Sequence, residues 1–140
     1  MLKTMFIIAA AFLSFLPDAM ALTCLPTVLD QAKIDAAEVV FEGKVIAKSP
    51  LAKTDYYHMQ KETFEVTHAY KGVKQGDHVD LYRDIYWGDG INDGDSRLVL
   101  SFLRDGADYG VEGKAYFAPV CIHTNYFPVT DENKKLLQPK

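Results

Sequence analysis

The sequence predicts a mainly β domain, a small barrel or sandwich of five strands with very little helix. Five segments alternate apolar and polar side chains with a period of two, the pattern of a strand with one buried face. Glycine and aspartate turn signals lie between several of these segments. Short strands separated by such turns favour a barrel or a sandwich over a helical fold.

One stretch ahead of the strands has helical spacing. In the segment Thr27–Ala37 (TVLDQAKIDAA), Val28 and Ala32 lie one helical turn apart, and Ile34 extends the same apolar pattern. Thr27 follows a proline and is of a residue type that caps helices at their N-terminus. We therefore expect one short helix over 27–37 with Thr27 as its cap.

The first strand is expected over Val39–Ala47 (VVFEGKVIA), where Glu42 and Lys44 face away from an apolar row. Gly43 interrupts the middle of this strand, and a glycine in such a place suggests a bulge or a sharp bend. Ser49–Met59 follows as a long connection that carries exposed aromatic residues.

Four further strands complete the expected five. In the strand Glu62–Tyr70, the side chains of Phe64, Val66, His68 and Tyr70 share one face. Glycines after this strand predict a turn before the next one. The other three strands are expected at His78–Ile85, Arg97–Arg104 and Gly113–Pro119, and the tail 131–140 is interpreted as a loose terminus or a short solvated helix.

The N-terminal residues have the features of a secretory signal peptide. Lys3 supplies a positive charge, Met5–Leu16 is an apolar run, and Ala19–Ala21 places small residues at the positions that a signal peptidase reads. A transmembrane anchor is the alternative, but the run is shorter than the roughly 20 residues that span a bilayer. We expect a signal peptide over 1–21, a periplasmic or secreted chain, and a single domain over 22–130.

The charge balance indicates which partners to exclude. Removal of residues 1–21 takes away one charge of each sign, so the net charge stays at −4. Nucleic acids and anionic membranes require a basic surface that neutralises phosphates. We therefore expect no nucleic-acid partner and no membrane insertion after signal cleavage.

Cys24 and Cys121 are the two cysteines of the chain. In an oxidising compartment they are free to pair, and two cysteines allow only one intramolecular disulfide. A loop of that length adds at most about 4–5 kcal/mol of stability in the chain-entropy model. Two free thiols are the alternative, which the exported location disfavours.

An acidic stretch, WGDGINDGDSRLVL, raises the question of a calcium loop. Asp89, Asp93 and Asp95 are the candidate ligands. A calcium loop of the EF-hand type needs an oxygen ligand at every second position, and Ile91 occupies one of these positions. The alternative is a hairpin turn at Asp93–Asp95, because Asp and Gly accept the backbone angles of such turns.

Enzyme and metal signatures are weak. None of the four histidines (His58, His68, His78 and His123) shows the short spacing of a preformed metal pair, and we interpret His68 as a core or rim residue. The chain also lacks Gly-x-Ser-x-Gly, His-Glu-x-x-His and phosphate-binding loops. We expect no catalysis and no cofactor.

Several stretches together carry a family resemblance through their order and spacing. They are Cys24-x-Pro26, Ala37-Glu38-Val39-Val40-Phe41-x-Gly43-Lys44-Val45, Phe64-x-Val66 followed by Tyr70-Lys71-Gly72, Trp87-Gly88-x-x-Ile91-x-x-Gly94-x-x-Arg97-Leu98-Val99-Leu100, Asp105-Gly106, and Cys121-x-x-Thr124. This pattern resembles the netrin-like domain, whose best-known members are the tissue inhibitors of metalloproteinases, and it covers most of residues 24–128. The resemblance implies a five-stranded Greek-key OB-fold barrel with one or two flanking short helices.

The departures from the family pattern concern its disulfides. Family members often begin with Cys-x-Cys and form two bridges from these cysteines. Here Leu22 stands at the place of the first cysteine, and Trp87 at the place of its partner. Both halves of one bridge are absent together, so the resemblance supports the remaining Cys24–Cys121 pairing.

The resemblance also implies how the chain acts. In the animal inhibitors, the α-amino group and carbonyl of the first mature residue chelate the zinc of the target protease, a role that would fall to Leu22 here. An export-processed terminus without a function is the alternative. Aromatic residues at interfaces often anchor a protein partner. The expected partner-binding residues are Leu22, Thr23, Tyr56, Tyr57, Tyr86 and Trp87. Packing of the aromatic side chains in the core or at its rim is the alternative.

The leading hypothesis is therefore an exported, monomeric, non-catalytic domain that recognises a protein, with a zinc metalloprotease as the partner that the resemblance implies. The alternative is a periplasmic structural or adaptor domain with no protease target.

Overall fold

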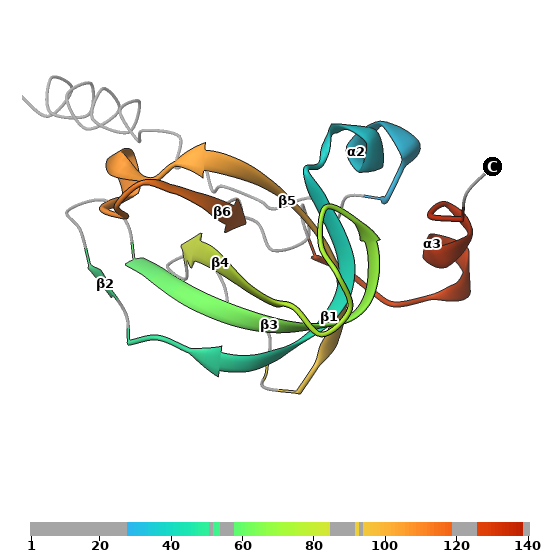
Figure 1. Cartoon of the computed structure of the whole chain (residues 1–140), viewed down its shortest axis with the longest axis horizontal. Helices are drawn as coiled ribbons and strands as arrows, with labels where there is room; N and C mark the ends of the chain where they lie inside the picture. Colours follow the sequence, from blue (N-terminus) through green and yellow to red (C-terminus); the bar gives the residue numbers. More distant parts are fainter. Residues whose placement is uncertain are drawn as a thin grey trace, which may run out of the picture.

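A computed structural model of the chain describes residues 28–50, 52–53, 58–84, 92, 94–118 and 126–138. This part of the chain is mainly β, with two short helices and one 3-10 turn (Figure 1). The elements are α2 (Gln31–Ala36), β1 (Val39–Lys48), β2 (Ala52–Lys53), β3 (His58–Lys71), β4 (His78–Asp84), β5 (Ser96–Asp105), η2 (Ala107–Tyr109), β6 (Lys114–Ala118), β7 (Tyr126–Phe127) and α3 (Asp131–Lys135). The mainly β class and all five predicted strands are confirmed.

The five longer strands pair in a ring. Its order is β1-β3-β4-β6-β5, and β5 returns to pair with β1. Four of these pairs are antiparallel, whereas β4 and β6 run parallel. The short strand β2 pairs with β3, and β7 pairs with β5. Strands that are distant in the sequence thus become neighbours around one interior.

Bulges between β1 and β3 confirm the irregularity expected at Gly43. Glu42 pairs with His68 and Gly43 pairs with Val66, so Thr67 is an extra residue on β3. Its hydroxyl donates to the Glu42 carbonyl at 3.1 Å. A Cβ on Gly43 would lie 2.8 Å from the Phe41 ring, so a side chain there would force its neighbours to move.

The same bulge corrects the prediction that His68 shares the face of Phe64 and Val66. His68 is exposed, although a regular alternation along β3 would place it on the same face as the buried Phe64 and Val66. One extra residue in a strand turns every following side chain to the opposite face. The alternation that places Phe64 and Val66 inside therefore ends at Thr67.

Two apolar clusters lie on the two sides of strands β1 and β5. The interior cluster fills the ring, and the outer cluster lies between the ring and the helices. In β5, Val99 belongs to the interior cluster, whereas Leu98 and Leu100 belong to the outer one. Burial on both faces explains why β5 is the most continuously apolar strand of the sequence.

Helix α2 is shorter than the predicted 27–37 segment, and its cap is Asp30. The Asp30 side chain accepts a hydrogen bond from the Lys33 amide at 2.8 Å, which satisfies one of the free donors at the start of a helix. Thr27, the predicted cap, lies outside the described residues. At the other end of α2, the ammonium of Lys71 lies 2.9 Å from the carbonyl of Asp35. This contact ties α2 to the end of β3.

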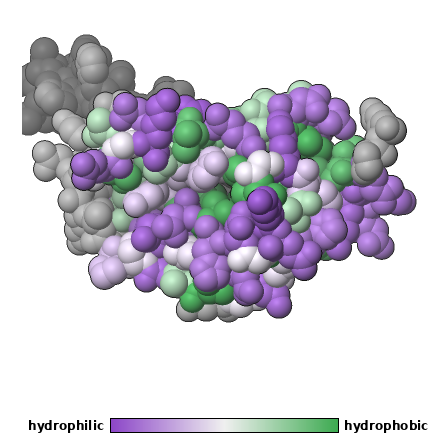
Figure 2. Space-filling model, viewed as in Figure 1, coloured by the Kyte–Doolittle hydropathy of each residue, from purple (hydrophilic) through white to green (hydrophobic). Residues whose placement is uncertain are grey.

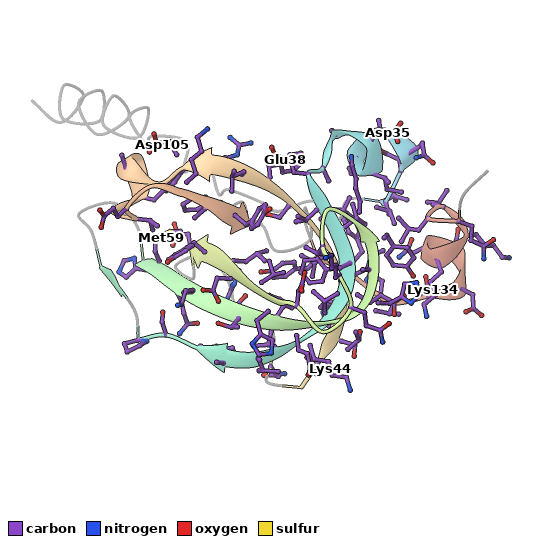
Figure 3. The ribbon with its side chains drawn as sticks, viewed as in Figure 1. Asp35, Glu38, Lys44, Met59, Asp105 and Lys134 are labelled. Carbon is purple, nitrogen blue, oxygen red and sulfur yellow. The ribbon has the colours of Figure 1, made fainter. Side chains whose placement is uncertain are left out.

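The C-terminal segment forms the helix α3 and contacts the ring. Thr130 caps α3 by accepting from the Asn133 amide. Lys134, labelled in Figure 3, lies 3.4 Å from the Glu42 carboxylate, which also accepts a hydrogen bond from Tyr70. Leu137 packs against the outer cluster. Of the two interpretations of the tail, a short helix agrees with the structure.

Candidate binding surface

All six residues predicted to bind a partner lie outside the described part of the chain. These are Leu22, Thr23, Tyr56, Tyr57, Tyr86 and Trp87, together with the signal peptide 1–21, the disulfide candidates Cys24 and Cys121, and the calcium candidates Asp89 and Asp93. What the structure describes is where the segments with these residues join the sheet.

Two of these segments join the sheet side by side. Segment 54–57 leads into β3 at His58, and segment 85–91 follows β4 after Asp84. Met59 pairs with Asp84 across the two strands, and the His58 amide donates to the Asp84 carboxylate at 3.2 Å. Figure 3 labels Met59 at this end of the sheet. Two of the three sequence segments that carry predicted contact residues are therefore attached to adjacent points of the sheet.

A small hollow lies beside this junction. Its volume is about 260 Å³, and its lining includes Met59 and Lys61 of β3, Tyr82 of β4, and Tyr109 of η2. The ring of Tyr109 packs on Phe117 with centroids 4.8 Å apart. A hollow of this size is somewhat below the roughly 300–1,000 Å³ of sites for whole ligands. It suits a single inserted side chain.

A buried ion pair connects β3 and β4 below the junction. Arg83 of β4 donates to one oxygen of Glu62 of β3 through Nε at 3.2 Å and Nη2 at 3.0 Å. Tyr126 of β7 donates its hydroxyl to the other oxygen at 3.1 Å. Glu62 is 0% exposed and Arg83 is 2% exposed. The carboxylate is thus satisfied on both oxygens, which buried charges require.

This ion pair was not predicted from the sequence, although the sequence contains a signal for it. The alternation of β3 places Glu62 on the same face as the buried Phe64. The alternation of β4 places Arg83 on the same face as the buried Leu81. Two opposite charges on the apolar faces of consecutive predicted strands indicate a buried pair. Tyr126 had no such signal, because its two-residue strand is too short for a periodic pattern.

The ion pair lies against a tyrosine with an altered pKa. Burial raises the pKa of Tyr126 well above its usual range, and the negative charge of Glu62 raises this pKa further. The neutral phenol keeps its proton on the side of the carboxylate, where it donates the hydrogen bond. Ionisation of Tyr126 would remove this donor and bring two negative charges together.

We expect the protein to lose stability in alkaline solution because of Tyr126. The raised pKa means that an unfolded tyrosine, with a pKa of about 10, ionises before the folded one, so rising pH favours the unfolded chain. Tyr126→Phe should weaken this alkaline loss while lowering stability at neutral pH by about 1–3 kcal/mol. Urea unfolding at about pH 8 and about pH 11 measures both effects. Equal alkaline losses in the two proteins would contradict the expectation.

Asp95 is the one calcium candidate that the structure describes. Its carboxylate lies 3.3 Å from the guanidinium of Arg97, and its amide bonds to the Asn92 carbonyl. Gly94 beside it has a φ of 83°, which a turn glycine adopts readily. Among the described residues, no group of three or more His, Cys, Asp or Glu side chains is placed to hold a metal ion.

Comparisons with known proteins add no relative to this description. No protein-family model matches the chain, and no curated protein matches it. Of the helices in the described ranges, none has both the length and the apolar character that crossing a membrane requires.

Proposed function

We propose that this chain is an exported, non-catalytic protein-binding domain with a netrin-like OB-fold barrel. The ring order β1-β3-β4-β6-β5 with one parallel pair supports the barrel proposal, because an OB-fold is a five-stranded, partly open Greek-key barrel. In this proposal the signal peptide is cleaved after Ala21, and Cys24–Cys121 ties the N-terminus to the end of the ring.

The observation that carries the binding function is the junction of His58 and Asp84. The segments with Tyr56, Tyr57 and Trp87 are attached there to neighbouring strand ends. The backbone nitrogen of His58 lies 3.2 Å from the Asp84 carboxylate oxygen that accepts its hydrogen bond. Loops held by a rigid scaffold are the common place for binding residues. The Glu62–Arg83 pair makes that scaffold rigid, since it links β3 to β4 within three residues of the paired Met59 and Asp84 on each strand. We infer that the two segments form one aromatic contact surface.

The partner that the family resemblance favours is a zinc metalloprotease. In this proposal, the contact surface binds the protease, and Leu22 presents its amine and carbonyl to the open coordination position of the catalytic zinc. The sequence departs from the family in lacking a bridge at Leu22. A terminus held only through Cys24 loses more freedom on binding, so the inhibition should be weaker than a doubly bridged terminus would allow.

The test is a titration of the exported protein against a panel of zinc endopeptidases, with residual activity as the readout. We expect inhibition of at least one of them. The double variant Tyr56→Ser/Tyr57→Ser and the variant Trp87→Ser should each weaken this inhibition about tenfold or more, as loss of interface anchors does. A chain with one additional alanine before Leu22 should lose inhibition if the amine reaches the zinc.

The matched control is Glu132→Ala on α3, an exposed position on another element of the fold. It should inhibit as the unaltered protein does. Inhibition that survives the aromatic substitutions would overturn the contact surface, and inhibition that survives the added alanine would overturn the chelation. No inhibition of any protease would favour a structural or adaptor role instead.

A further inference from the structure

The ring is incompletely closed between β4 and β6. These parallel strands pair through only three residue pairs, Leu81 with Tyr116, Tyr82 with Phe117, and Arg83 with Ala118. On the N-terminal side of these pairs, His78–Asp80 of β4 pairs with β3 alone, and Lys114–Ala115 of β6 pairs with β5 alone. The described part of the ring therefore has two short free strand edges that face one opening.

At His78, the backbone hydrogen-bonding groups of β4 point toward its free edge. The amide of Val66 donates to the carbonyl of Asp77, which makes Glu65 and His78 a non-hydrogen-bonded pair of the antiparallel ladder. In such a pair, the backbone N–H and C=O groups point away from the partner strand. The N–H and C=O of His78 thus face away from β3, at an edge that is able to pair with another strand.

A groove occupies the opening beside this edge. It has a volume of about 510 Å³, within the roughly 300–1,000 Å³ of ligand sites, and both strand edges line it. Val73, Val111 and Leu103 supply apolar lining, and Leu103 is a large apolar side chain that remains 41% exposed. Figure 2 shows hydrophobic surface in patches within an otherwise hydrophilic face.

The groove continues toward the junction of β3 and β4. Tyr82, Val111 and Glu112 line both this groove and the 260 Å³ hollow beside Met59. The two hollows together follow the sheet from the β3–β4 turn to the junction that carries the proposed contact surface.

The charges around the groove are mainly negative. Asp77, Asp80 and Glu112 line it, against one lysine, Lys114. Asp80 is also 3.3 Å from Lys61, so Asp77 and Glu112 are the acids without a described ion-pair partner. An occupant with a basic side chain would complement this rim.

We propose that the groove binds an extended segment of the partner protein, which adds as a strand to the edge of β4 at His78 and carries a basic residue toward Glu112. Backbone hydrogen bonds supply the affinity in this mode, and side-chain pockets supply the specificity. The hollow beside Met59 supplies such a pocket, and the exposed Leu103 supplies an apolar contact within the groove. This inference rests on the proposed protein-binding function and adds the chemistry of the bound segment.

Two substitutions of one residue test the strand addition. His78→Pro removes the backbone N–H that faces the groove but no ladder bond to β3, and proline is tolerated at the first residue of an edge strand. His78→Ala keeps the N–H and removes only the imidazole. Circular dichroism and thermal unfolding of both variants verify that the fold is retained.

The probes are short fluorescent peptides that alternate valine with lysine, and matched peptides that alternate valine with glutamate. Fluorescence polarisation gives their Kd with the exported protein. We expect the lysine peptide to bind about tenfold or more tightly than the glutamate peptide, and Glu112→Lys to reduce this preference. His78→Pro should weaken binding about tenfold, whereas His78→Ala should bind within about twofold of the unaltered protein.

Three results would overturn the proposal. They are no saturable binding of the lysine peptide up to about 1 mM, equal binding by the two His78 variants, and self-association of the protein that His78→Pro abolishes. The last result would show that a second copy of the chain occupies the edge. Peptide binding is measured without a protease, so failure of protease inhibition and failure of strand addition are separate outcomes.

Discussion

Replacement of Arg83 by methionine is expected to lower the free energy of unfolding by about 3–5 kcal/mol. The substitution removes the cation but leaves the Glu62 carboxylate inside the ring, where it is 0% exposed. A buried charge without its counter-ion loses both the attraction and two hydrogen bonds, at 3.0 and 3.2 Å here. Denaturant unfolding, monitored through the far-ultraviolet circular dichroism, measures the change.

Two further variants separate this effect from a general effect of losing a cation. Lys61→Met makes the same kind of change in an exposed pair, Lys61 with Asp80, and should alter stability by at most about 1 kcal/mol. The double variant Glu62→Gln/Arg83→Met neutralises both charges and keeps an acceptor for Tyr126. It should be at least about 1 kcal/mol more stable than Arg83→Met. A double variant as unstable as the sum of its single changes would contradict the explanation.

Replacement of Gly72 by alanine is the second change with a large expected effect. Gly72 lies in the turn after β3 with a φ of 73°, a conformation that costs other residues roughly 1–2 kcal/mol. A Cβ at this position would also lie 2.2 Å from the carbonyl oxygen of Glu38, which is backbone that has little freedom to move. We expect the two effects together to exceed about 2 kcal/mol.

Gly76→Ala in the same turn is the matched control. Gly76 also has a positive φ, 87°, but nothing lies within 4 Å of a Cβ built there. It should therefore show only the conformational cost of roughly 1–2 kcal/mol. Denaturant unfolding of both variants measures the difference, which isolates the contact with Glu38. If both substitutions cost the same, the close approach of Glu38 contributes nothing measurable.

The sequence predicted the local elements well, because their signals are local. The period-two alternation of apolar residues located all five longer strands to within a few residues, apart from the longer N-terminal part of β3. The connection 49–59 was expected to be irregular, yet His58 and Met59 already belong to β3 through pairing with β4. Met59 has no alternating neighbours in the connection, so no local pattern marked it.

The prediction that His68 shares the face of Phe64 and Val66 was wrong for a different reason. A bulge is decided by the register of two strands, and the extra residue Thr67 is recognised only from its partners Glu42 and Gly43 on β1. Gly43 indicated that a bulge was present but not which strand carried the extra residue. The alternation along one strand therefore predicts which face a side chain takes only up to the nearest bulge.

The candidate site combines both kinds of information. The aromatic segments were predicted from composition and from the family resemblance, whereas their attachment to adjacent strand ends depends on the pairing of Met59 with Asp84. The Glu62–Arg83 pair and the free edge at His78 were found only after the strands were placed. No pattern within β4 distinguishes its free N-terminal half from its paired C-terminal half.

By itself, the sequence determined where the five longer strands lie and, as far as the nearest bulge, which apolar side chains each of them buries, since side-chain alternation depends on near neighbours in the chain. Only the tertiary structure decided that the ring has the order β1-β3-β4-β6-β5, that Tyr126 reaches Glu62 from 64 residues away, and that β4 and β6 separate beside His78. The physical reason is that such contacts depend on the packing of the whole interior, where distant apolar faces must close around one core.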